Sequence, residues 1–307
     1  MKVELITPEK YTDDFVVDCA RVSFAKRSDQ FTPEQNAKLI RYLNSPPDSV
    51  PHWAPFAGPR ICFGFGMALT PESWAKFLTH ANLAGFSWAA LGYDAYQING
   101  SLWAWKENLH LLPKFHAQAI QNCLVDMFPI CAGVFGWEQT GMSFPQVQAN
   151  RASTVYENLR IKAPIFVARQ LVKHQVHLAW SEVSRRYVKD RPELWWPKEW
   201  HKAPTHSKQG ASKELFDWPM ANYEGLADTI VDNYEYLVSV GLAPEEARIL
   251  LPQSMMTEWI WTGSIAAFQR VCRERLAPGA QGATREVAQM IDSALAQKHG
   301  SNWREMT

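Results

Sequence analysis

Residues 169–187 read RQLVKHQVHLAWSEVSRRY and contain an unusual concentration of side chains that can hold anions. Basic and imidazole groups come first, and a carboxylate, hydroxyls, two adjacent arginines and a tyrosine follow. The whole chain has 31 basic and 31 acidic residues, so this polarity is local and not general. The stretch therefore predicts an anion-binding site.

The composition limits the class of protein. With 307 residues, 47% of them hydrophobic, the chain can bury a large core without disulfides or structural metal. The balanced charge lacks the basic excess of a general nucleic-acid binder and favours a small-molecule ligand. The five cysteines are odd in number and never form a C-x-x-C pair, which predicts reduced thiols in a cytoplasmic protein. No apolar run has signal-peptide or membrane-spanning length, so no membrane partner is expected.

The first half of the central stretch has helical spacing. If a helix spans 164–178, Arg169, Lys173 and His177 form one cationic stripe, and Gln170 and His174 lie beside it. Two or three positive groups at this spacing suit a pyrophosphate or phosphate ester. An ordinary solvated basic face is the open alternative.

The second half suits a nucleotide. If residues 182–187 are extended, Glu182, Ser184 and Arg186 point to one face. The guanidinium could hold a phosphate, and the carboxylate and hydroxyl could hold base and sugar. Alternatively, Glu182 and Arg186 could simply pair with each other.

The flanking segments predict an α+β chain. Thr32, Pro33 and Gln35 form a capping box that begins a helix, which Pro46 and Pro47 end. The aromatic connection at 192–212 has no periodicity, and loops of that length are usually functional or mobile. Strands are further predicted at 3–6, 60–65 and 158–162, helices at 223–237, 257–275 and 283–295, a short helix from Pro244, and a helical insertion at 66–149.

The central stretch resembles the signature of the flavin-dependent thymidylate synthases, R-H-R-x7-S at the start of R-H-R-x-x-S-x-N-E-x-S-x-R-Y. Residues 182–187 read EVSRRY and match E-x-S-x-R-Y in full. In the first half Lys173-His174-Gln175 stands where R-H-R is expected, Ser181 replaces the asparagine, and one extra residue lies between the halves.

Further blocks in the same order resemble this family. Residues 20–24 read ARVSF, and 52–56 look like the start of H-W-S-P-F-E-H, after which Ala57 and Gly58 stand where glutamate and a flavin-contacting histidine would be. The remaining blocks are VELI at 3–6, KQG at 208–210, RILLP at 248–252, TEW at 257–259 and AQGATR at 280–285. Only the segment at about 66–149 lies outside the resemblance.

The resemblance implies an α+β synthase-like fold, a mixed sheet with flanking helices and an inserted helical segment. Residues 1–65 and 150–307 would form the synthase-like domain around the insertion at 66–149. Members of the family are homotetramers with sites shared between subunits. They bind FAD, take electrons from NADPH and a carbon unit from methylenetetrahydrofolate, and convert dUMP to dTMP.

The resemblance also implies roles for individual residues. Arg285 and Ser184 would be catalytic, and Arg248 would bind the nucleotide phosphate from a neighbouring subunit. The substrate, a pyrimidine deoxynucleoside monophosphate, would contact Glu182, Ser184, Arg186, Tyr187, Arg248 and Arg285. The cofactors would contact His52, Arg169, Lys173, His174, Gln175, His177, Arg275 and Gln281.

Three functions stay open at this point. Gln175 replaces an arginine of the R-H-R motif and so removes a bidentate donor, and Ala57 and Gly58 replace two side chains on the flavin side. The cofactor-binding half of the site is therefore altered, while the nucleotide-binding half is nearly intact. The first function is methylation of dUMP at C5. The second is hydroxymethylation or hydroxylation of dUMP or dCMP, and the third is a nucleotide-binding subunit without turnover. No metal is predicted, because the two histidine pairs, His174 with His177 and His201 with His206, lack a third ligand nearby.

Overall fold

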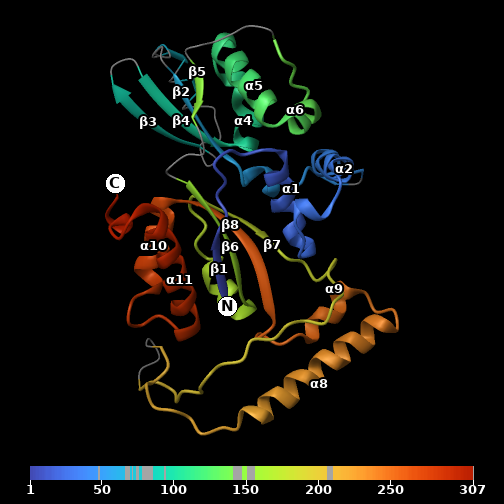
Figure 1. The fold of residues 1–307 in the computed structure, drawn as a ribbon. Helices are drawn as coiled ribbons and strands as arrows, with labels where there is room; N and C mark the ends of the chain where they lie inside the picture. Colours follow the sequence, from blue (N-terminus) through green and yellow to red (C-terminus); the bar gives the residue numbers. More distant parts are fainter. Residues whose placement is uncertain are drawn as a thin grey trace. The chain divides into compact units, whose positions relative to one another are not determined.

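The computed structural model describes the chain except residues 48, 66–69, 71, 74–75, 78–85, 93–94, 141–146, 151–155, 206–209 and 307. The chain divides into two compact units (Figure 1). Unit 1 contains Met1–Ile6, Ser23–Ala25 and Leu159–Thr307, and unit 2 contains Thr7–Val22 and Lys26–Asn158. The assignment of 66–149 as an insertion in a synthase-like domain stays a prediction.

Unit 1 is built on a sheet with the strand order β1-β6-β8-β7. β1 (Lys2–Leu5) pairs antiparallel with β6 (Tyr156–Pro164), and β7 (Leu178–Glu182) pairs antiparallel with β8 (Met256–Ser264). The predicted strands at the N-terminus and at 158–162 are confirmed, and the second is longer than expected.

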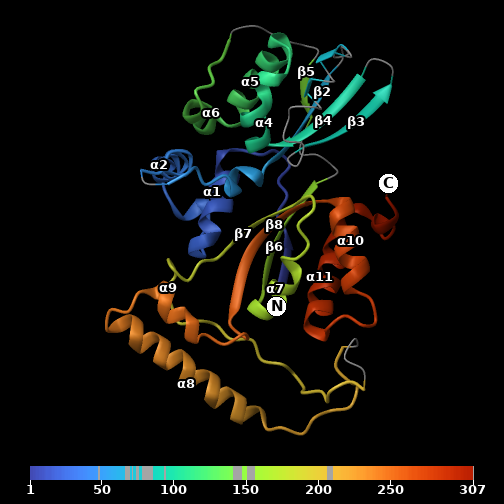
Figure 2. The same cartoon turned by 180° about the vertical axis from the view of Figure 1, so that it is seen from behind.

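Helices α7 (Ile165–Leu171), α10 (Ile265–Arg275) and α11 (Gly282–His299) share one core with this sheet. Figures 1 and 2 both show α10 and α11 side by side against the strands. Each large side chain buried here contributes about 1.5–3 kcal/mol through the hydrophobic effect. Fully buried members of this core include Leu159, Ile161, Trp259, Trp261, Phe268, Val287, Ile291 and Leu295.

The helix predicted over 164–178 is wrong beyond Leu171, where α7 ends, and the helix predicted over 257–275 begins only at Ile265. The misassigned residues are strands β7 and β8, which pair with each other. A strand partner distant in sequence is invisible to local periodicity, and short apolar runs are ambiguous between helix and strand.

Tryptophans show why the two segments pair as strands. Trp180 lies opposite Trp261 in the register, and its ring stacks on Trp259 with centroids 4.4 Å apart. Cross-strand aromatic pairs of this kind stabilise a sheet. Ser264 then ends β8 and caps α10 by accepting a hydrogen bond from the Ala267 amide at 3.1 Å.

α8 (Met220–Ser239) confirms the helix predicted at 223–237. Its buried residues are Ala227, Val231 and Tyr234, whereas Leu226 is 60% exposed. α9 (Pro244–Ala247) and the 3₁₀ turn η6 (Arg248–Leu250) pack against α8. Among the described residues, none of the helices has both the length and the apolar character needed to cross a membrane.

Unit 2 holds a second sheet with the order β3-β4-β2-β5. Its strands are β2 (Arg60–Phe65), β3 (Phe86–Gly92), β4 (Ala95–Ser101) and β5 (Val147–Asn150), and all its pairs are antiparallel. The prediction of a purely helical segment at 66–149 is therefore wrong for β3, β4 and β5. The predicted strand β2 lies between β4 and β5, and its backbone N–H and C=O groups pair with both neighbours.

The helices of unit 2 combine confirmed and unforeseen features. In α2 the predicted capping box is present: the Gln35 amide donates to Thr32 Oγ1 at 3.3 Å, and the Thr32 amide donates to Gln35 Oε1 at 3.0 Å. The buried Asp13 accepts hydrogen bonds from the amides of Ile130 and Cys131 at the start of α6. In the described part of unit 2, the helices with assigned bounds are α1 (Asp13–Arg21), α2 (Pro33–Asn44), α4 (Leu102–Asn108), α5 (Lys114–Met127) and α6 (Pro129–Phe135). The α+β class is confirmed for both units.

Candidate functional site

The end of β7 places Glu182 in a fixed position. Its Oε1 accepts a hydrogen bond from Thr257 Oγ1 at 2.7 Å, and its Oε2 accepts one from Trp180 Nε1 at 2.9 Å. Both donors belong to the paired strands β7 and β8. A carboxylate has about four lone-pair sites, so Glu182 can still accept hydrogen bonds from a ligand.

Residues 184–187 form a turn and not the extended segment that the sequence suggested. The Tyr187 amide donates to the Ser184 carbonyl at 3.0 Å, so Glu182, Ser184 and Arg186 do not share one strand face. Ser23 fixes this geometry, because its carbonyl accepts from the Ser184 amide at 2.9 Å and its hydroxyl donates to the Glu182 carbonyl at 3.0 Å. We call residues 184–187 the signature turn.

The signature turn also contacts the residue that follows Ser23. The Tyr187 ring stacks on Phe24, with centroids 4.6 Å apart and planes inclined by 23°. The Arg186 guanidinium lies 5.7 Å from the Tyr187 ring centroid. Both rings are partly exposed, with Tyr187 48% and Phe24 39% accessible, so they offer an aromatic surface to solvent. Two segments far apart in sequence therefore form one side of a candidate site.

Two predicted phosphate ligands meet at Glu245. Arg186 Nε lies 3.1 Å from Glu245 Oε2, and Arg248 Nε donates to the Glu245 carbonyl at 3.2 Å. Arg186 is therefore paired with the Glu245 carboxylate, whereas Arg248 donates to the backbone of the same residue. The alternative pairing of Arg186 with Glu182 is not the one that forms.

Arg285 has a different environment in the first turn of α11. Its Nη2 donates to the carbonyls of Ala277 at 3.2 Å and Ala280 at 2.7 Å, and also contacts the Pro278 carbonyl. Its Nε is buried and has no hydrogen-bond partner among the described residues. Arg285 therefore organises the turn before α11, and one of its donors is unused. Its catalytic role stays a prediction.

Several of the residues predicted to bind cofactors form one cluster. Arg275 Nε donates to His174 Nε2 at 3.0 Å, and Arg275 Nη2 donates to the Gln170 carbonyl at 3.1 Å. Gln170 Nε2 in turn donates to Gln281 Oε1 at 2.5 Å. Burial and then the charge of Arg275 lower the pKa of His174, so its imidazole is neutral and accepts from the guanidinium.

The predicted cationic stripe is wrong. α7 ends at Leu171, so Arg169, Lys173 and His177 do not lie along one helix. His177 has a positive φ of 59°, a left-handed conformation that costs energy for a residue with a side chain. Arg169, Lys173, Gln175 and His177 are nevertheless all exposed, and their roles as cofactor ligands stay predictions.

Unit 2 contains the remaining predicted ligand and two of the altered positions. His52 stacks on Tyr42, with ring centroids 6.0 Å apart. Ala57 is buried, and a Cβ added to Gly58 would lie 2.4 Å from the Cys19 Sγ. The space beside Gly58 is therefore filled by Cys19, and no side chain fits there without a shift.

Sequence reasoning missed four residues that hold the site together: Ser23, Thr257, Glu245 and Gln170. Ser23 was part of the quoted ARVSF block, and Glu245 lies three residues before Arg248, which brings the two onto neighbouring positions of one helical turn. Thr257 belonged to the quoted TEW block and Gln170 lay beside the predicted cationic stripe, but neither pattern indicated their hydrogen-bond partners, which come from other elements. Lys208, Gln209 and His206 lie outside the described residues.

Comparison with known proteins adds an independent finding. The family model described as "Thymidylate synthase complementing protein" matches residues 152–299. The chain is 28% identical over 316 residues to the flavin-dependent thymidylate synthase of Aquifex aeolicus, covering 91% of this chain and 93% of the relative. The enzyme of the same name from Thermus thermophilus is 31% identical over 144 residues, 47% of this chain and 53% of the relative. That of Kosmotoga olearia is 38% identical over 108 residues, 33% of this chain and 46% of the relative.

Proposed function

Because this chain belongs to the flavin-dependent thymidylate synthase family, we propose that it methylates dUMP at C5 to give dTMP. The observation that carries this proposal is the signature turn, which Ser23 holds by hydrogen bonds, Phe24 by ring stacking and Glu245 by an ion pair with Arg186. This arrangement combines an aromatic surface, hydroxyl groups and a guanidinium group. Such a set suits a pyrimidine nucleotide that carries one phosphate.

In the proposed complex, Arg186 binds the phosphate, and Arg248 contributes to the phosphate site of a neighbouring subunit. The Arg186–Glu245 ion pair is about half exposed on both sides, at 55% and 54%, and exposed pairs contribute little stability. A phosphate dianion offers the guanidinium a stronger, bidentate partner than one carboxylate oxygen does. The nucleotide would therefore replace Glu245 at Arg186.

The other predicted substrate ligands would orient the nucleoside. Glu182 is a fixed acceptor for a sugar hydroxyl, since Thr257 and the sheet hold its carboxylate in place. Ser184 and Tyr187 would contact the nucleotide from the signature turn. Arg285 would turn a guanidinium donor to a base carbonyl and stabilise negative charge that develops on the pyrimidine during the reaction.

The donor set in unit 1 fits a flavin dinucleotide. Arg275 supplies a cation, neutral His174 and Gln281 supply polar groups, and exposed Lys173 and Gln175 lie nearby in sequence. We propose that these residues, with Arg169 and His177, hold FAD or the folate. His52 of unit 2 stays, by itself, a proposed cofactor ligand. FAD, once bound and reduced by NADPH, would supply the hydride transfer, and methylenetetrahydrofolate would supply the carbon. We further propose the family fold, a homotetramer with shared sites, and a cytoplasmic location.

The structure of unit 2 also supports a second candidate function. Gly58 stands where the resemblance places a flavin-contacting histidine, and Cys19 fills the space that such a side chain would need. Without the flavin-contacting histidine, the cofactor side of the site is altered, and water or oxygen could then take part in the reaction. The product would then be a hydroxymethylated or hydroxylated dUMP or dCMP, made from the same nucleotide half of the site.

One experiment tests these proposals. The purified protein is mixed with FAD, NADPH and methylenetetrahydrofolate, dUMP and dCMP are offered separately, and the products are weighed by mass spectrometry. A methyl group gained by dUMP is the expected result, and a gain that includes oxygen supports the second candidate. Absence of product from either nucleotide, despite bound flavin, contradicts both. An R186Q variant should lose nucleotide binding, whereas R41Q, at an exposed position of α2, serves as the matched control.

A further inference from the structure

The aromatic connection that leads to α8, residues 192–219, touches the turn before α11 at Gly210. A Cβ added to Gly210 would lie 3.1 Å from the Ala280 carbonyl oxygen, which is closer than an ordinary van der Waals contact. Gly210 does not have a positive φ. The close approach, and not the backbone conformation, is therefore what requires a glycine at this position.

The Ala280 carbonyl is also a hydrogen-bond partner of Arg285. It accepts from Arg285 Nη2 at 2.7 Å, and the Ala277 carbonyl accepts from the same nitrogen at 3.2 Å. The Ala280 amide donates to the Ala277 carbonyl at 2.9 Å, so both acceptors belong to one closed turn. A side chain at Gly210 would therefore press on the oxygen that fixes the Arg285 guanidinium.

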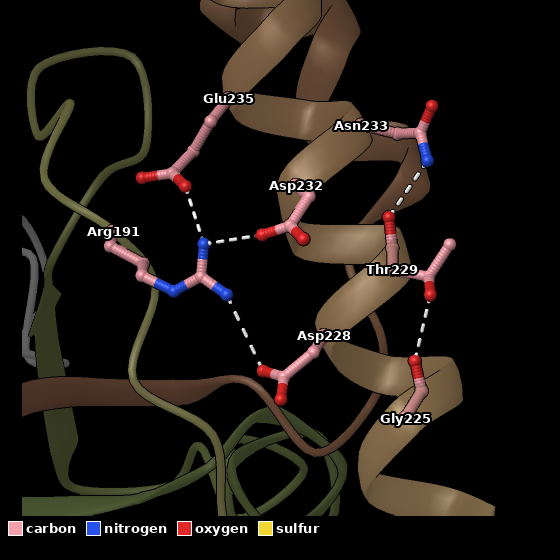
Figure 3. Close-up of polar contacts among 7 residues, drawn as sticks. All are labelled: Arg191, Gly225, Asp228, Thr229, Asp232, Asn233 and Glu235. Carbon is pink, nitrogen blue, oxygen red and sulfur yellow. Dashed lines mark hydrogen bonds and ion pairs between the residues drawn. The ribbon is translucent and has the colours of Figure 1, made fainter.

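The connection is anchored on α8 at both of its ends. Before it, three carboxylates of α8 bind the Arg191 guanidinium (Figure 3). Arg191 Nη1 contacts Asp232 Oδ1 at 2.7 Å and Glu235 Oε2 at 2.5 Å, and Arg191 Nη2 lies 3.4 Å from Asp228 Oδ1. After it, α8 begins directly at Met220. The start and the end of the connection are therefore held by the same helix.

Between these ends the connection folds back on itself. The Phe216 amide donates to the Trp200 carbonyl at 2.8 Å, and the Ser212 amide donates to the Lys202 carbonyl at 3.0 Å. The Trp200 ring also packs on Tyr223 of α8, with centroids 5.2 Å apart. These contacts limit how far the connection can move to relieve a clash with the turn before α11.

We propose that Gly210 is a positioning residue for the pyrimidine. Its lack of a side chain lets the connection rest against Ala280 without displacing the carbonyl that holds Arg285. The buried Arg285 Nε, which has no hydrogen-bond partner among the described residues, is thereby kept in place for a carbonyl of the base. This inference rests on the proposed function, in which Arg285 binds the pyrimidine. The contact lies within one chain, so it applies to the nucleotide of whichever subunit Arg285 serves.

The test compares two ligands of the full chain loaded with FAD by calorimetry: dUMP, and deoxyribose 5-phosphate, which has no base. G210V should weaken dUMP binding roughly tenfold, because misplacement of a positioned group by about an ångström has effects of this size or larger. G210A needs a shift of only a few tenths of an ångström and should weaken dUMP binding about twofold. The affinity for deoxyribose 5-phosphate should stay unchanged in both variants, because that ligand makes no base contact.

A double-mutant cycle shows whether the effect passes through Arg285. R285Q already removes the base contact, so G210V added to R285Q should weaken dUMP binding no further. A merely structural role of Gly210 would instead give the same loss in both backgrounds. If G210V does not fold, G210A takes its place in the cycle.

A matched control is a second glycine of unit 1. Gly225 lies in α8, where its carbonyl accepts from Thr229 Oγ1 at 2.8 Å (Figure 3), and a Cβ added to it meets nothing within 4 Å. G225A should leave the affinity for both ligands at the wild-type value. It should also raise the midpoint of urea unfolding, because alanine is a better helix former than glycine.

Three results would decide against these expectations. Equal dUMP affinity in wild type and the folded Gly210 variant overturns the inference and leaves the proposed function standing. The same holds if the Gly210 variant loses both ligands equally, or loses as much dUMP affinity in the R285Q background as in wild type. A wild-type protein that binds no dUMP instead removes the proposed function, and this inference with it.

Discussion

Replacing Gly58 with alanine should destabilise unit 2, although the backbone there tolerates a side chain. Gly58 has φ −65° and ψ −55°, so a Gly→Ala change at such a site normally stabilises by about 0.4–1 kcal/mol through the unfolded state. The added Cβ would lie 2.4 Å from Cys19 Sγ and 3.3 Å from the Pro55 carbonyl oxygen. Overpacking of a buried site costs about 1–3 kcal/mol, so the net loss should be about 0.5–2 kcal/mol.

A second variant in the same experiment removes the Cys19 sulfur that the new methyl group would meet. Cys19 is 1% exposed, and C19A alone should cost about 1 kcal/mol by leaving a small cavity. In the double variant the new methyl group fills part of that cavity. The two changes should therefore couple favourably by about 1 kcal/mol in a double-mutant cycle. Urea unfolding of the four proteins, with unchanged m-values, measures each free energy of unfolding.

Two results would refute this reasoning. One is a G58A protein at least as stable as wild type, and the other is a double variant no more stable than the sum of the two single changes. Either would mean that Cys19 moves freely, and that packing does not explain the glycine where the resemblance places histidine. The prediction therefore also bears on the second candidate function, which depends on that packing.

Three further predictions concern unit 1. T257V should lower the free energy of unfolding by about 1–2 kcal/mol, measured by urea unfolding, because the Glu182 carboxylate loses a charge-assisted hydrogen bond. Since burial lowers the pKa of His174 below its ordinary 6.5, stability should be complete above pH 6.5 and fall as the pH drops below it. H174Q should remove this loss of stability below pH 6.5, measured as the midpoint of thermal unfolding against pH. The same pH dependence in wild type and H174Q would contradict the assignment of the effect to His174. E245Q should change stability by less than about 0.5 kcal/mol, yet tighten dUMP binding measured by calorimetry, because Arg186 loses its competitor.

The candidate site was partly predictable from sequence. The motif at 182–187 identified Ser184, Arg186 and Tyr187, and ARVSF identified the block that contacts them. The geometry was not predictable, because the sequence suggested an extended segment where Ser23 imposes a turn. The cofactor half shows the same limit: His174, Arg275 and Gln281 were named, but their cluster depends on Gln170, which belongs to a helix that ends sooner than its periodicity indicated.

Features set by neighbours along the chain were determined by the sequence itself. The capping box of α2, the proline that precedes α7 and the apolar spacing of α8 and α11 each act within a few residues, so local patterns predict them. Only the tertiary structure decided that residues 178–182 and 256–264 are strands, because each is stabilised by its partner. The same holds for the junction of Ser23, Arg186 and Arg248, where hydrogen bonds and ion pairs join segments that no local pattern connects.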